Sequence, residues 1–314
     1  MKLIIQIPCY NEAETLEVTL NALPKKVNGI DIIEILIIND GSSDETVKVA
    51  KKWGVHHIVN FNKNKGLAKG FMAGIDRCVK EGADIIVNTD ADNQYRADDI
   101  QDLVRPILEK KADIVVGTRP INETEHFSFI KKMLQNFGSW VVRIASNTEI
   151  QDAPSGFRAI SRDSAMRLNV FNDYTYTLET IIQAGQKNMA IISVPIHTNA
   201  DLRPSRLFSS IPMYVKKSVG TIIRIFIIYR PMRFFSSIGM ALFIPGFLLG
   251  IRWLVLYLTD VDGTHVPSLV LASILMLSGF MSILSGFISD LIATNRKLLE
   301  EIQYKVRKIE HGDN

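Results

Sequence analysis

Two carboxylates and an amide follow an apolar run in the first third of the chain. Residues 85–87 are apolar and rich in β-branched side chains, and Asp90, Asp92 and Gln94 follow at alternate positions. Because side chains two residues apart in an extended segment point the same way, these three groups are expected to converge. Their hard oxygen atoms suit Mg²⁺ or Mn²⁺, which complete their shells with water and substrate phosphates. The spacing predicts a divalent metal ion that holds a diphosphate.

A solvated acidic loop would show the same short pattern, so the rest of the sequence is needed to distinguish the two interpretations.

The chain has 314 residues, of which 47% are hydrophobic and 22% charged, enough for one large core or two compact units. A net charge of +3 does not indicate a nucleic-acid-binding protein. Cys9 and Cys78 lack CxxC spacing and indicate neither a disulfide framework nor a zinc site, which fits a reducing compartment.

Apolar runs alternate with helical patterns over the first 200 residues. Strands are expected at residues 2–8, 32–38, 57–61, 84–88, 113–117 and 191–196. Between them, helices are expected after Asn11, which suits an N-cap, around residues 47–53, and at 65–81. The first run is short and Pro8 ends it, so it is predicted to be a strand and not a signal peptide. The alternation predicts an α/β fold with a Rossmann-like, mostly parallel, doubly wound sheet.

Three polar clusters, at residues 8–12, 39–44 and 90–94, all follow predicted strands. In such sheets, ligands bind beyond the carboxyl ends of the strands, so these clusters are expected to share one site. The sequence has neither GxGxxG after the first strand nor GxxxxGK[ST] anywhere. A nucleotide bound without a glycine-rich cradle needs a metal ion on its phosphates, which favours the metal interpretation of the acidic loop.

The last third of the chain has the composition of a membrane anchor. Residues 234–258 and 267–292 are each long enough to cross a bilayer and contain one charge each, Arg252 and Asp290. Before them, residues 211–226 show apolar side chains at helical spacing with basic residues elsewhere. That pattern is typical of an amphipathic helix in a membrane interface, and a core helix of the soluble domain fits the periodicity equally well.

Basic residues flank the two apolar segments, whereas the loop between them, residues 259–266, has two aspartates and no Lys or Arg. By the positive-inside rule, both termini and the α/β domain are expected to be cytoplasmic. We therefore predict a cytoplasmic catalytic domain at residues 1–205, interfacial amphipathic helices at 206–232, a transmembrane hairpin at 233–292 and a charged cytoplasmic tail at 293–314. Self-association through the tail is an open alternative to a monomer.

Six short motifs occur in the order typical of one family. They are IPCYNE at 7–12, NDGSSD at 39–44, NKG at 64–66, DADNQ at 90–94, GTR at 117–119 and SGFR at 155–158. Together they are far more specific than any one alone. With them the chain resembles the family-2 glycosyltransferases of GT-A fold, specifically the sugar transferases that act on dolichyl or undecaprenyl phosphate. The hairpin matches members of this group that carry two membrane helices.

The resemblance implies a nucleotide-sugar site and a metal site. The residues expected to bind the nucleotide sugar are Pro8, Tyr10, Glu12, Asp40, Lys65, Asp90, Ala91, Asp92, Arg158, Arg203 and Arg206. The expected ligands of Mg²⁺ or Mn²⁺ are Asp90, Asp92 and Gln94. Asp40 alone would also suit a turn-forming Asp-Gly, and any single arginine here would suit a surface ion pair.

The acceptor determines which chemistry the protein must supply. A lipid monophosphate is largely dianionic at neutral pH, with a second pKa of about 6, so it needs no general base. Cationic groups are needed to position two like-charged phosphates. The expected acceptor-phosphate residues are Arg119, Lys131, Lys132 and Ser155, and the expected catalytic residues are Asp152, Asp92 and Arg119. By the resemblance, Asp152 lies near the reacting carbon, where it would orient a substrate or stabilise an oxocarbenium-like transition state.

These observations predict an inverting, metal-dependent hexosyltransferase that transfers one sugar from a nucleotide-diphosphate sugar to polyprenyl phosphate for glycan assembly. A UDP-linked donor such as UDP-glucose or UDP-GlcNAc is favoured, because RPSR at 203–206 replaces the Gly-x-Ser-Lys of mannose-transferring relatives. GDP-mannose is the alternative donor. A non-catalytic nucleotide-sugar-binding membrane protein is a second alternative, which the intact metal-ligand set disfavours. A processive synthase is disfavoured because it needs more membrane spans and a Gln-x-x-Arg-Trp motif, which the sequence lacks.

Overall fold

The computed structural model describes residues 1–119, 142–143, 146, 148–170, 176–200, 220, 223–224, 227–259 and 266–312. The chain divides into two compact units. The first comprises Met1–Val219 together with Glu300–Asn314, and the second comprises Gly220–Leu299.

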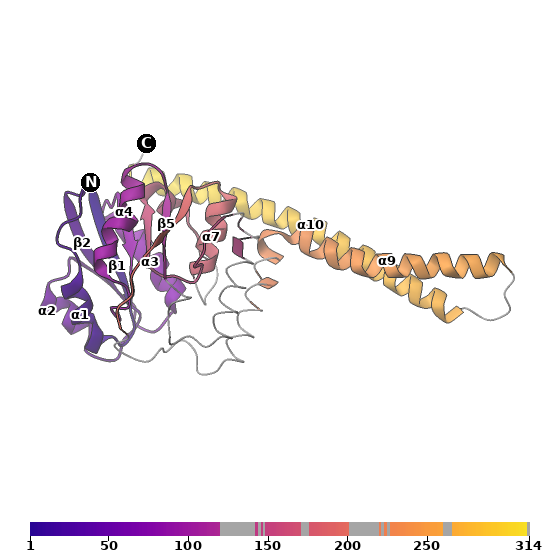
Figure 1. Cartoon of the computed structure of the whole chain (residues 1–314), viewed down its shortest axis with the longest axis horizontal. Coiled ribbons are helices and arrows are strands. Elements are labelled where there is room, and N and C mark those ends of the chain that lie inside the picture. The colour runs from indigo at the N-terminus through magenta and orange to yellow at the C-terminus, as the bar shows by residue number, and fades with distance from the viewer. Residues whose placement is uncertain are drawn as a thin grey trace. The chain divides into compact units, whose positions relative to one another are not determined.

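A seven-stranded sheet forms the centre of the first unit (Figure 1). Its strand order is β3-β2-β1-β4-β6-β5-β7. The strands are β1 (Lys2–Cys9), β2 (Ile32–Asn39), β3 (His57–Asn60), β4 (Ile85–Asn88), β5 (Ile114–Thr118), β6 (Arg158–Ser161) and β7 (Ile191–Pro195). All neighbouring pairs are parallel except those of β6, which is antiparallel to β4 and β5. The predicted mostly parallel α/β sheet is confirmed.

Strand β6 is the strand that the sequence analysis missed. It has only four residues, Arg158–Ser161, and it begins with a charged residue and ends with a polar one. An apolar run of two residues carries no periodicity by which a strand can be recognised. It is a strand because it pairs with β4 on one side and β5 on the other, and these contacts come from segments that are distant in sequence.

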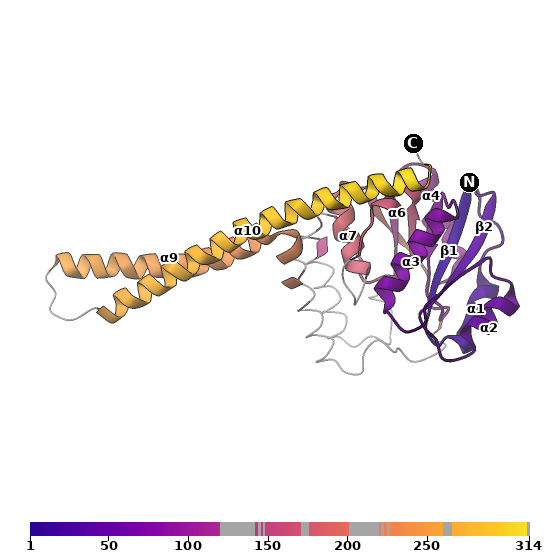
Figure 2. The same ribbon diagram turned by 180° about the vertical axis from the view of Figure 1, so that it is seen from behind.

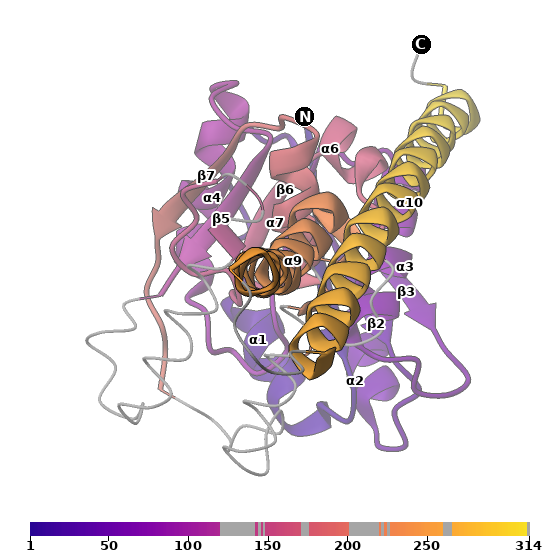
Figure 3. The ribbon, with the colours of Figure 1, turned by 90° about the vertical axis from the view of Figure 1, so that its right-hand side faces the viewer.

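Helices cover both faces of the sheet. They are α1 (Ala13–Ala22), α2 (Thr46–Trp53), α3 (Leu67–Lys80), α4 (Ile100–Leu108), α6 (Arg162–Arg167) and α7 (Thr177–Gln186). Alternate residues of β1, namely Leu3, Ile5 and Ile7, are fully buried in one core with residues of α1, α2 and α4. Helix α3 covers the opposite face, so α3 and α4 lie on opposite sides of the strands (Figure 3). Strands buried on both faces explain the continuous apolar runs in the sequence.

The start of α1 differs from the prediction. Asn11 was expected to be the N-cap, but Glu12 holds that position and Asn11 has a left-handed φ of 55°. The Asn11 side chain instead accepts a hydrogen bond from the Ser43 backbone N–H at 2.8 Å. The first-turn N–H of Ala13 donates to Asp44 at 3.0 Å. Residues after β2 therefore cap α1, a long-range arrangement that local sequence does not encode.

Two long apolar helices, α9 (Pro231–Leu258) and α10 (Val266–Glu310), follow the α/β sheet and its helices in sequence. Both are long and apolar enough to cross a membrane. They approach closely at two glycines, because a Cβ on Gly239 would lie 2.7 Å from the Gly279 carbonyl oxygen. The predicted interfacial segment, residues 206–232, lies mostly outside the described residues, which include only positions 220, 223–224 and 227–232 of it.

Helix α10 does not end where its apolar segment ends but continues through the charged tail to Glu310. The last turns pack on the first unit, beside α3 and α6 (Figure 2). The Tyr304 hydroxyl donates to Asp163 and accepts from Arg167 at 2.9 Å. Arg307 donates to the Met166 carbonyl and to Asp76, at 3.0 Å in each case. Residues 300–312 of the predicted tail are thus part of the first unit.

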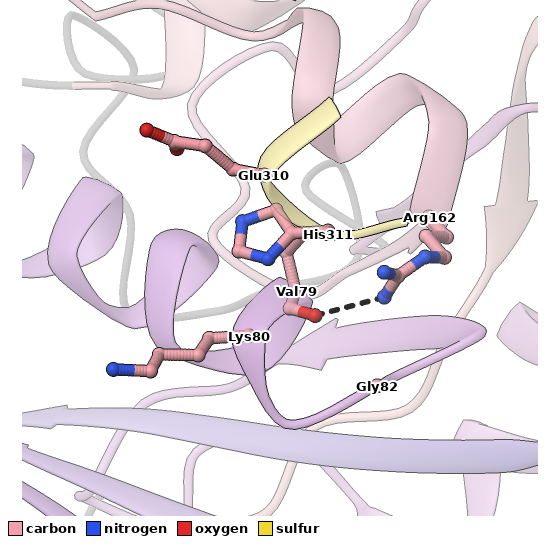
Figure 4. Close-up of a pocket in the computed structure, with 6 residues that line it drawn as sticks. All are labelled: Val79, Lys80, Gly82, Arg162, Glu310 and His311. Atoms are coloured by element: carbon pink, nitrogen blue, oxygen red, sulfur yellow. Dashed lines mark hydrogen bonds between the residues drawn. The ribbon is translucent and has the colours of Figure 1, made fainter. Parts of the chain in front are cut away.

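A cavity of about 520 Å³ lies at this junction, lined by Val79, Lys80, Gly82, Arg162, Glu310 and His311 (Figure 4). Arg162 donates to the Val79 carbonyl at 2.9 Å, so its guanidinium already serves to cap the end of α3. Gly82 precedes β4 whereas Asp90 follows it, so this cavity lies at the opposite edge of the sheet from the acidic loop. It is a feature of the tail contact and not of the predicted site.

We expect Tyr304→Phe to lower the free energy of unfolding by about 1 kcal/mol, because the hydrogen bonds of the hydroxyl are lost. The unfolding temperature should fall by a few degrees. Partial burial acts to raise the pKa of Asp163, but hydrogen bonds from Tyr304 and Arg167 lower the pKa overall. A lowered carboxylate pKa stabilises the folded state fully above the ordinary aspartate pKa, about 3.9, and that contribution is lost as the pH falls below it. The difference from wild type should therefore shrink in acid.

The measurement is thermal unfolding in detergent at neutral and acidic pH, with Tyr257→Phe as the matched control. Tyr257 is 67% exposed on α9, and we expect its substitution to leave the unfolding temperature unchanged. Equal unfolding temperatures for Tyr304→Phe and wild type at neutral pH would contradict a stabilising tail contact.

Candidate active site

The three polar clusters lie at one edge of the sheet. Strands β1, β2 and β4 are parallel, with Cys9 opposite Asn39 and Gln6 opposite Asn88. The segments that follow these strands, beginning at Tyr10, Asp40 and Thr89, therefore leave the sheet at its carboxyl edge. This is where doubly wound sheets bind their ligands.

The segment after β1 presents one exposed aromatic ring and one buried carboxylate. Tyr10 is 45% exposed, whereas Glu12 is buried and accepts a hydrogen bond from the Thr15 hydroxyl at 3.0 Å. The backbone N–H of Glu12 donates to Thr46 at 2.9 Å, which ties this segment to the start of α2. Pro8 lies two residues before Tyr10 and is the partly buried, second-to-last residue of β1.

Asp40 holds the segment after β3 against the end of β2. One carboxylate oxygen accepts from the Lys65 N–H at 2.6 Å and the other from the Gly66 N–H at 2.9 Å. The two segments approach so closely that a Cβ on Gly41, whose φ is +71°, would lie 2.4 Å from the Lys63 backbone. A carboxylate can accept about four hydrogen bonds, so Asp40 retains acceptor capacity for a base or ribose. The Lys65 ammonium lies 4.4 Å from the centre of the Phe61 ring.

The acidic loop is a turn and not the extended segment that we assumed. Asn93 has a left-handed φ of 55°, and an oxygen of Asp92 accepts from the Gln94 N–H at 3.2 Å. The loop is fixed on both sides: Thr19 of α1 donates to the Ala91 carbonyl at 2.8 Å, and Asn199 donates to the Asn93 carbonyl at 2.8 Å. The alternation of side chains in an extended strand therefore does not determine where the Asp90 and Asp92 carboxylates point. The turn determines it instead.

The chemistry of the donor set fits Mg²⁺ or Mn²⁺. Within the described ranges, no group of three or more His, Cys, Asp and Glu side chains is arranged to hold a metal ion. The loop instead offers two half-buried carboxylates, Asp90 and Asp92, with the Gln94 amide nearby. Because the protein supplies only a small number of ligands, coordination positions remain for water and phosphate. Mg²⁺ is usually bound in this way at phosphate-transfer sites.

A buried ion pair joins the end of β5 to the loop before β6. Arg119 donates to Asp152 through Nε at 2.7 Å and through an Nη atom at 3.0 Å. The Asp152 carboxylate is fully buried and Arg119 is 15% exposed. Burial alone would lower the pKa of Arg119, but nearby acidic groups, including Asp152 and Asp90, raise its pKa overall. The pair thus gives a permanently charged guanidinium close to the acidic loop.

Arg158 has a different role from the one expected. It was expected to bind the nucleotide sugar, but it is 1% exposed and donates its hydrogen bonds within the protein. It donates to the carbonyls of Ser155 and Ala153, both at 2.8 Å, and to the Thr180 hydroxyl. Burial lowers the pKa of Arg158 to about 10, so it remains charged at neutral pH. It fixes the loop that carries Asp152.

Ser155 is fully buried, and its hydroxyl has no hydrogen-bond partner in the part of the chain that the structure describes. Its role toward an acceptor phosphate stays a prediction. Four other predicted site residues, Lys131, Lys132, Arg203 and Arg206, lie outside the described residues.

Residues 4–169, just over half of the chain, match the family described as Glycosyl transferase family 2. The chain belongs to this family. The predicted resemblance is therefore confirmed, and the protein is a glycosyltransferase by family membership.

Among family-2 relatives, a UDP-N-acetylglucosamine–dolichyl-phosphate N-acetylglucosaminyltransferase from Methanococcus voltae is 29% identical, over 61% of this chain and 83% of that protein. An undecaprenyl-phosphate mannosyltransferase from Micrococcus luteus is 27% identical, over 62% of this chain and 83% of that protein. The two relatives share a polyprenyl-phosphate acceptor in their names and differ in the sugar.

The fold is similar to that of glucosyl-3-phosphoglycerate synthase from Mycobacterium tuberculosis, solved with Mn²⁺, UDP and glucosyl-3-phosphoglycerate. The TM-score is 0.56 at 17% identity, covering 72% of this chain and 78% of that one. This likeness confirms the GT-A-like fold.

Three buried side chains of this family-2 site were not recognised in the sequence: Asn88, Tyr95 and Tyr176. They lie around Gly156 and contact its peptide groups. A buried asparagine at the end of an apolar strand was the one available signal, because such a polar side chain requires hydrogen-bond partners. Nothing local to Tyr176, 20 residues after Gly156, indicates that the two meet.

We expect Asp152→Asn to destabilise the protein by about 3 to 5 kcal/mol, because it leaves the Arg119 guanidinium buried without its counter-ion. The measurement is unfolding of the purified protein in detergent. Asp102→Asn is the matched control, since Asp102 pairs with Arg105 at 3.2 Å on the exposed face of α4. That change should cost less than about 1 kcal/mol. Equal unfolding transitions for the two variants would show that the buried pair is not structural.

Proposed function

We propose that this protein is a metal-dependent, inverting glycosyltransferase that transfers one sugar from a nucleotide-diphosphate sugar to a polyprenyl phosphate. The observation that carries the proposal is the state of Asp152. Its carboxylate is fully buried and accepts two hydrogen bonds from the Arg119 guanidinium, at 2.7 and 3.0 Å, and a third from the Arg119 backbone N–H at 3.3 Å. A carboxylate held in this way is poorly suited to take a proton from a hydroxyl acceptor.

A phosphate acceptor removes the need for that proton transfer. A lipid monophosphate is largely dianionic at neutral pH, because its second pKa is about 6. The names of the Methanococcus voltae and Micrococcus luteus relatives, with dolichyl phosphate and undecaprenyl phosphate, support this acceptor class. In this proposal Asp152 is a positioning residue that holds Arg119, and Arg119 orients the acceptor phosphate.

The reaction is a single displacement. An oxygen of the acceptor phosphate attacks the anomeric carbon from the face opposite the diphosphate, and the carbon–oxygen bond to the diphosphate breaks with its electron pair leaving on the nucleoside diphosphate. The anomeric configuration is therefore inverted. Asp90, Asp92 and Gln94 would hold a Mg²⁺ or Mn²⁺ ion, which would neutralise charge on the leaving diphosphate. Arg119 supplies fixed positive charge near the two phosphates, which would otherwise repel each other.

For the donor, we propose a UDP-linked sugar. The UDP-N-acetylglucosamine named for the Methanococcus voltae relative supports this choice, as does the departure of RPSR at 203–206 from the mannose-type sequence. Tyr10, which is 45% exposed at the carboxyl edge, offers a ring on which a base could stack, and Asp40 offers acceptor atoms beside it. GDP-mannose is the second candidate, because the Micrococcus luteus relative is a mannosyltransferase.

We propose that α9 and α10 cross the bilayer and that the catalytic unit and both termini face the cytoplasm. The lengths of both helices and the long apolar stretch in each of them support the crossing. The orientation follows from basic residues that flank the two spans and from Asp260 and Asp262 in the loop between them. In this arrangement the acceptor phosphate, at the membrane surface, is on the same side as the nucleotide sugar.

The test is nucleoside-diphosphate release by the purified full chain with a short-chain polyprenyl phosphate and Mn²⁺ or Mg²⁺, across a panel of UDP- and GDP-sugars. We expect lipid-dependent release with one donor, loss of activity in EDTA, and a fall of at least about 100-fold for Asp92→Ala, since a metal ion supplies several kcal/mol to such reactions. Asp98→Ala is the matched control, because Asp98 is an exposed carboxylate a few residues after the loop and pairs with Arg96.

The outcomes separate the parts of the proposal. Release that persists in EDTA would overturn the metal dependence and leave the acceptor class standing. Release with GDP-mannose alone would overturn the UDP assignment. Nucleotide binding without lipid-dependent release for every donor would overturn the acceptor class.

A further inference from the structure

Gly156 lies against the carboxylate of Asp90. A Cβ built on Gly156 would lie 3.3 and 3.4 Å from the two Asp90 carboxylate oxygens and 3.1 Å from the Tyr176 hydroxyl. These distances are shorter than ordinary van der Waals contacts of a methyl group. The backbone at Gly156 therefore occupies one side of the Asp90 carboxylate, and any side chain there would displace one of the two neighbours.

Both peptide groups of Gly156 are held by side chains from elsewhere in the fold. Its N–H donates to the Tyr95 hydroxyl at 3.2 Å. Its carbonyl accepts from Asn88 at 2.9 Å and from the Tyr176 hydroxyl at 3.4 Å. The Asn88 amide also donates to the Tyr176 hydroxyl at 2.9 Å, so the three side chains form one connected frame around Gly156.

The frame is itself fixed by packing. The Tyr176 ring is stacked on Phe71 with centroids 3.9 Å apart, and the Tyr95 ring is stacked on Phe157 at 5.0 Å. The Asn88 carbonyl oxygen accepts from Gln6 at 2.9 Å. All three frame residues are buried, with exposures of 4% or less. Neither tyrosine hydroxyl can move away from Gly156 without losing a stacked contact and a buried hydrogen bond.

We propose that Asn88, Tyr95 and Tyr176 are positioning residues that hold Gly156 against Asp90 and so fix the direction of this carboxylate toward a divalent cation. The inference rests on the proposed metal-dependent function and goes beyond it, because none of the three residues belongs to the expected ligand set. A carboxylate that lies against a fixed backbone has fewer rotamers to lose when it binds a cation, so its affinity for the cation is higher.

Gly156→Ala is the direct test. Gly156 does not have a positive φ, so the substitution adds no left-handed backbone strain and changes only the space beside Asp90 and the Tyr176 hydroxyl. We expect Mn²⁺ affinity in the presence of UDP, measured from the electron paramagnetic resonance signal of free Mn²⁺, to fall by about 10- to 100-fold, the range for residues that support metal ligands. UDP binding measured without metal should be unchanged.

Gly70→Ala is the matched control. It makes the same chemical change in a buried part of the same unit, where a Cβ would meet only Ile38 at 3.7 Å, an ordinary contact. Its Mn²⁺ affinity should equal that of the wild type. Tyr176→Phe is a second, milder variant: it keeps the ring stacked on Phe71 and removes only the hydroxyl, and we expect a several-fold loss of Mn²⁺ affinity.

The failures of the two proposals are distinguishable. If the wild type binds no Mn²⁺ with UDP, the metal-dependent function fails, and the inference fails with it. If the wild type binds Mn²⁺ and both Gly156→Ala and Tyr176→Phe bind it equally well, only the positioning role is overturned. If Gly156→Ala does not fold, as judged by thermal unfolding, Tyr176→Phe decides by the same comparison.

Discussion

The bidentate ion pair between Arg119 and Asp152 extends the pairing of β5 and β6 beyond the sheet, because it joins the residue after β5 to the loop before β6. Both partners are largely out of water, so each is costly to bury without the other. Their mutual dependence fixes a guanidinium close to the acidic loop. Arg158 holds the same loop through hydrogen bonds to the carbonyls of Ala153 and Ser155, which ties the loop to the first residue of β6.

Charge of both signs therefore gathers at one edge of the sheet. In the proposed reaction, Asp90 and Asp92 would attract a divalent cation and, through it, a diphosphate, whereas Arg119 would supply positive charge for a second phosphate. Two phosphates repel each other, and an arrangement of this kind lowers that repulsion when both must approach one anomeric carbon. The carboxyl edge of a parallel sheet makes the arrangement possible, because it brings together loops that are distant in sequence.

The sequence predicted what depends on local patterns. The continuous apolar runs of the parallel strands, the acidic loop and the order of the motifs were sufficient to indicate the α/β sheet and the glycosyltransferase family. What tertiary contacts determine was not predictable. Strand β6 forms because β4 and β5 pair with it on either side. Asn11 is not the N-cap of α1, because Ser43 and Asp44 from another segment bond to the start of this helix. Arg158 is a buried structural residue, because its hydrogen-bond acceptors are Ala153, Ser155 and Thr180. In the sequence, an arginine that binds a ligand cannot be distinguished from one that supports a loop inside the protein.

The most direct test of transfer without a protein base is the pH dependence of kcat/KM for the wild-type protein with two acceptors, a polyprenyl phosphate and the matching phosphonate. The second ionisation of each acceptor can be measured independently by phosphorus NMR in the same micelles, and that of a phosphonate lies at higher pH. If the acceptor arrives already activated, the midpoint of the rise in rate follows the acceptor and moves upward with the phosphonate. A midpoint that is the same for both acceptors would assign the ionisation to the protein and contradict base-free transfer.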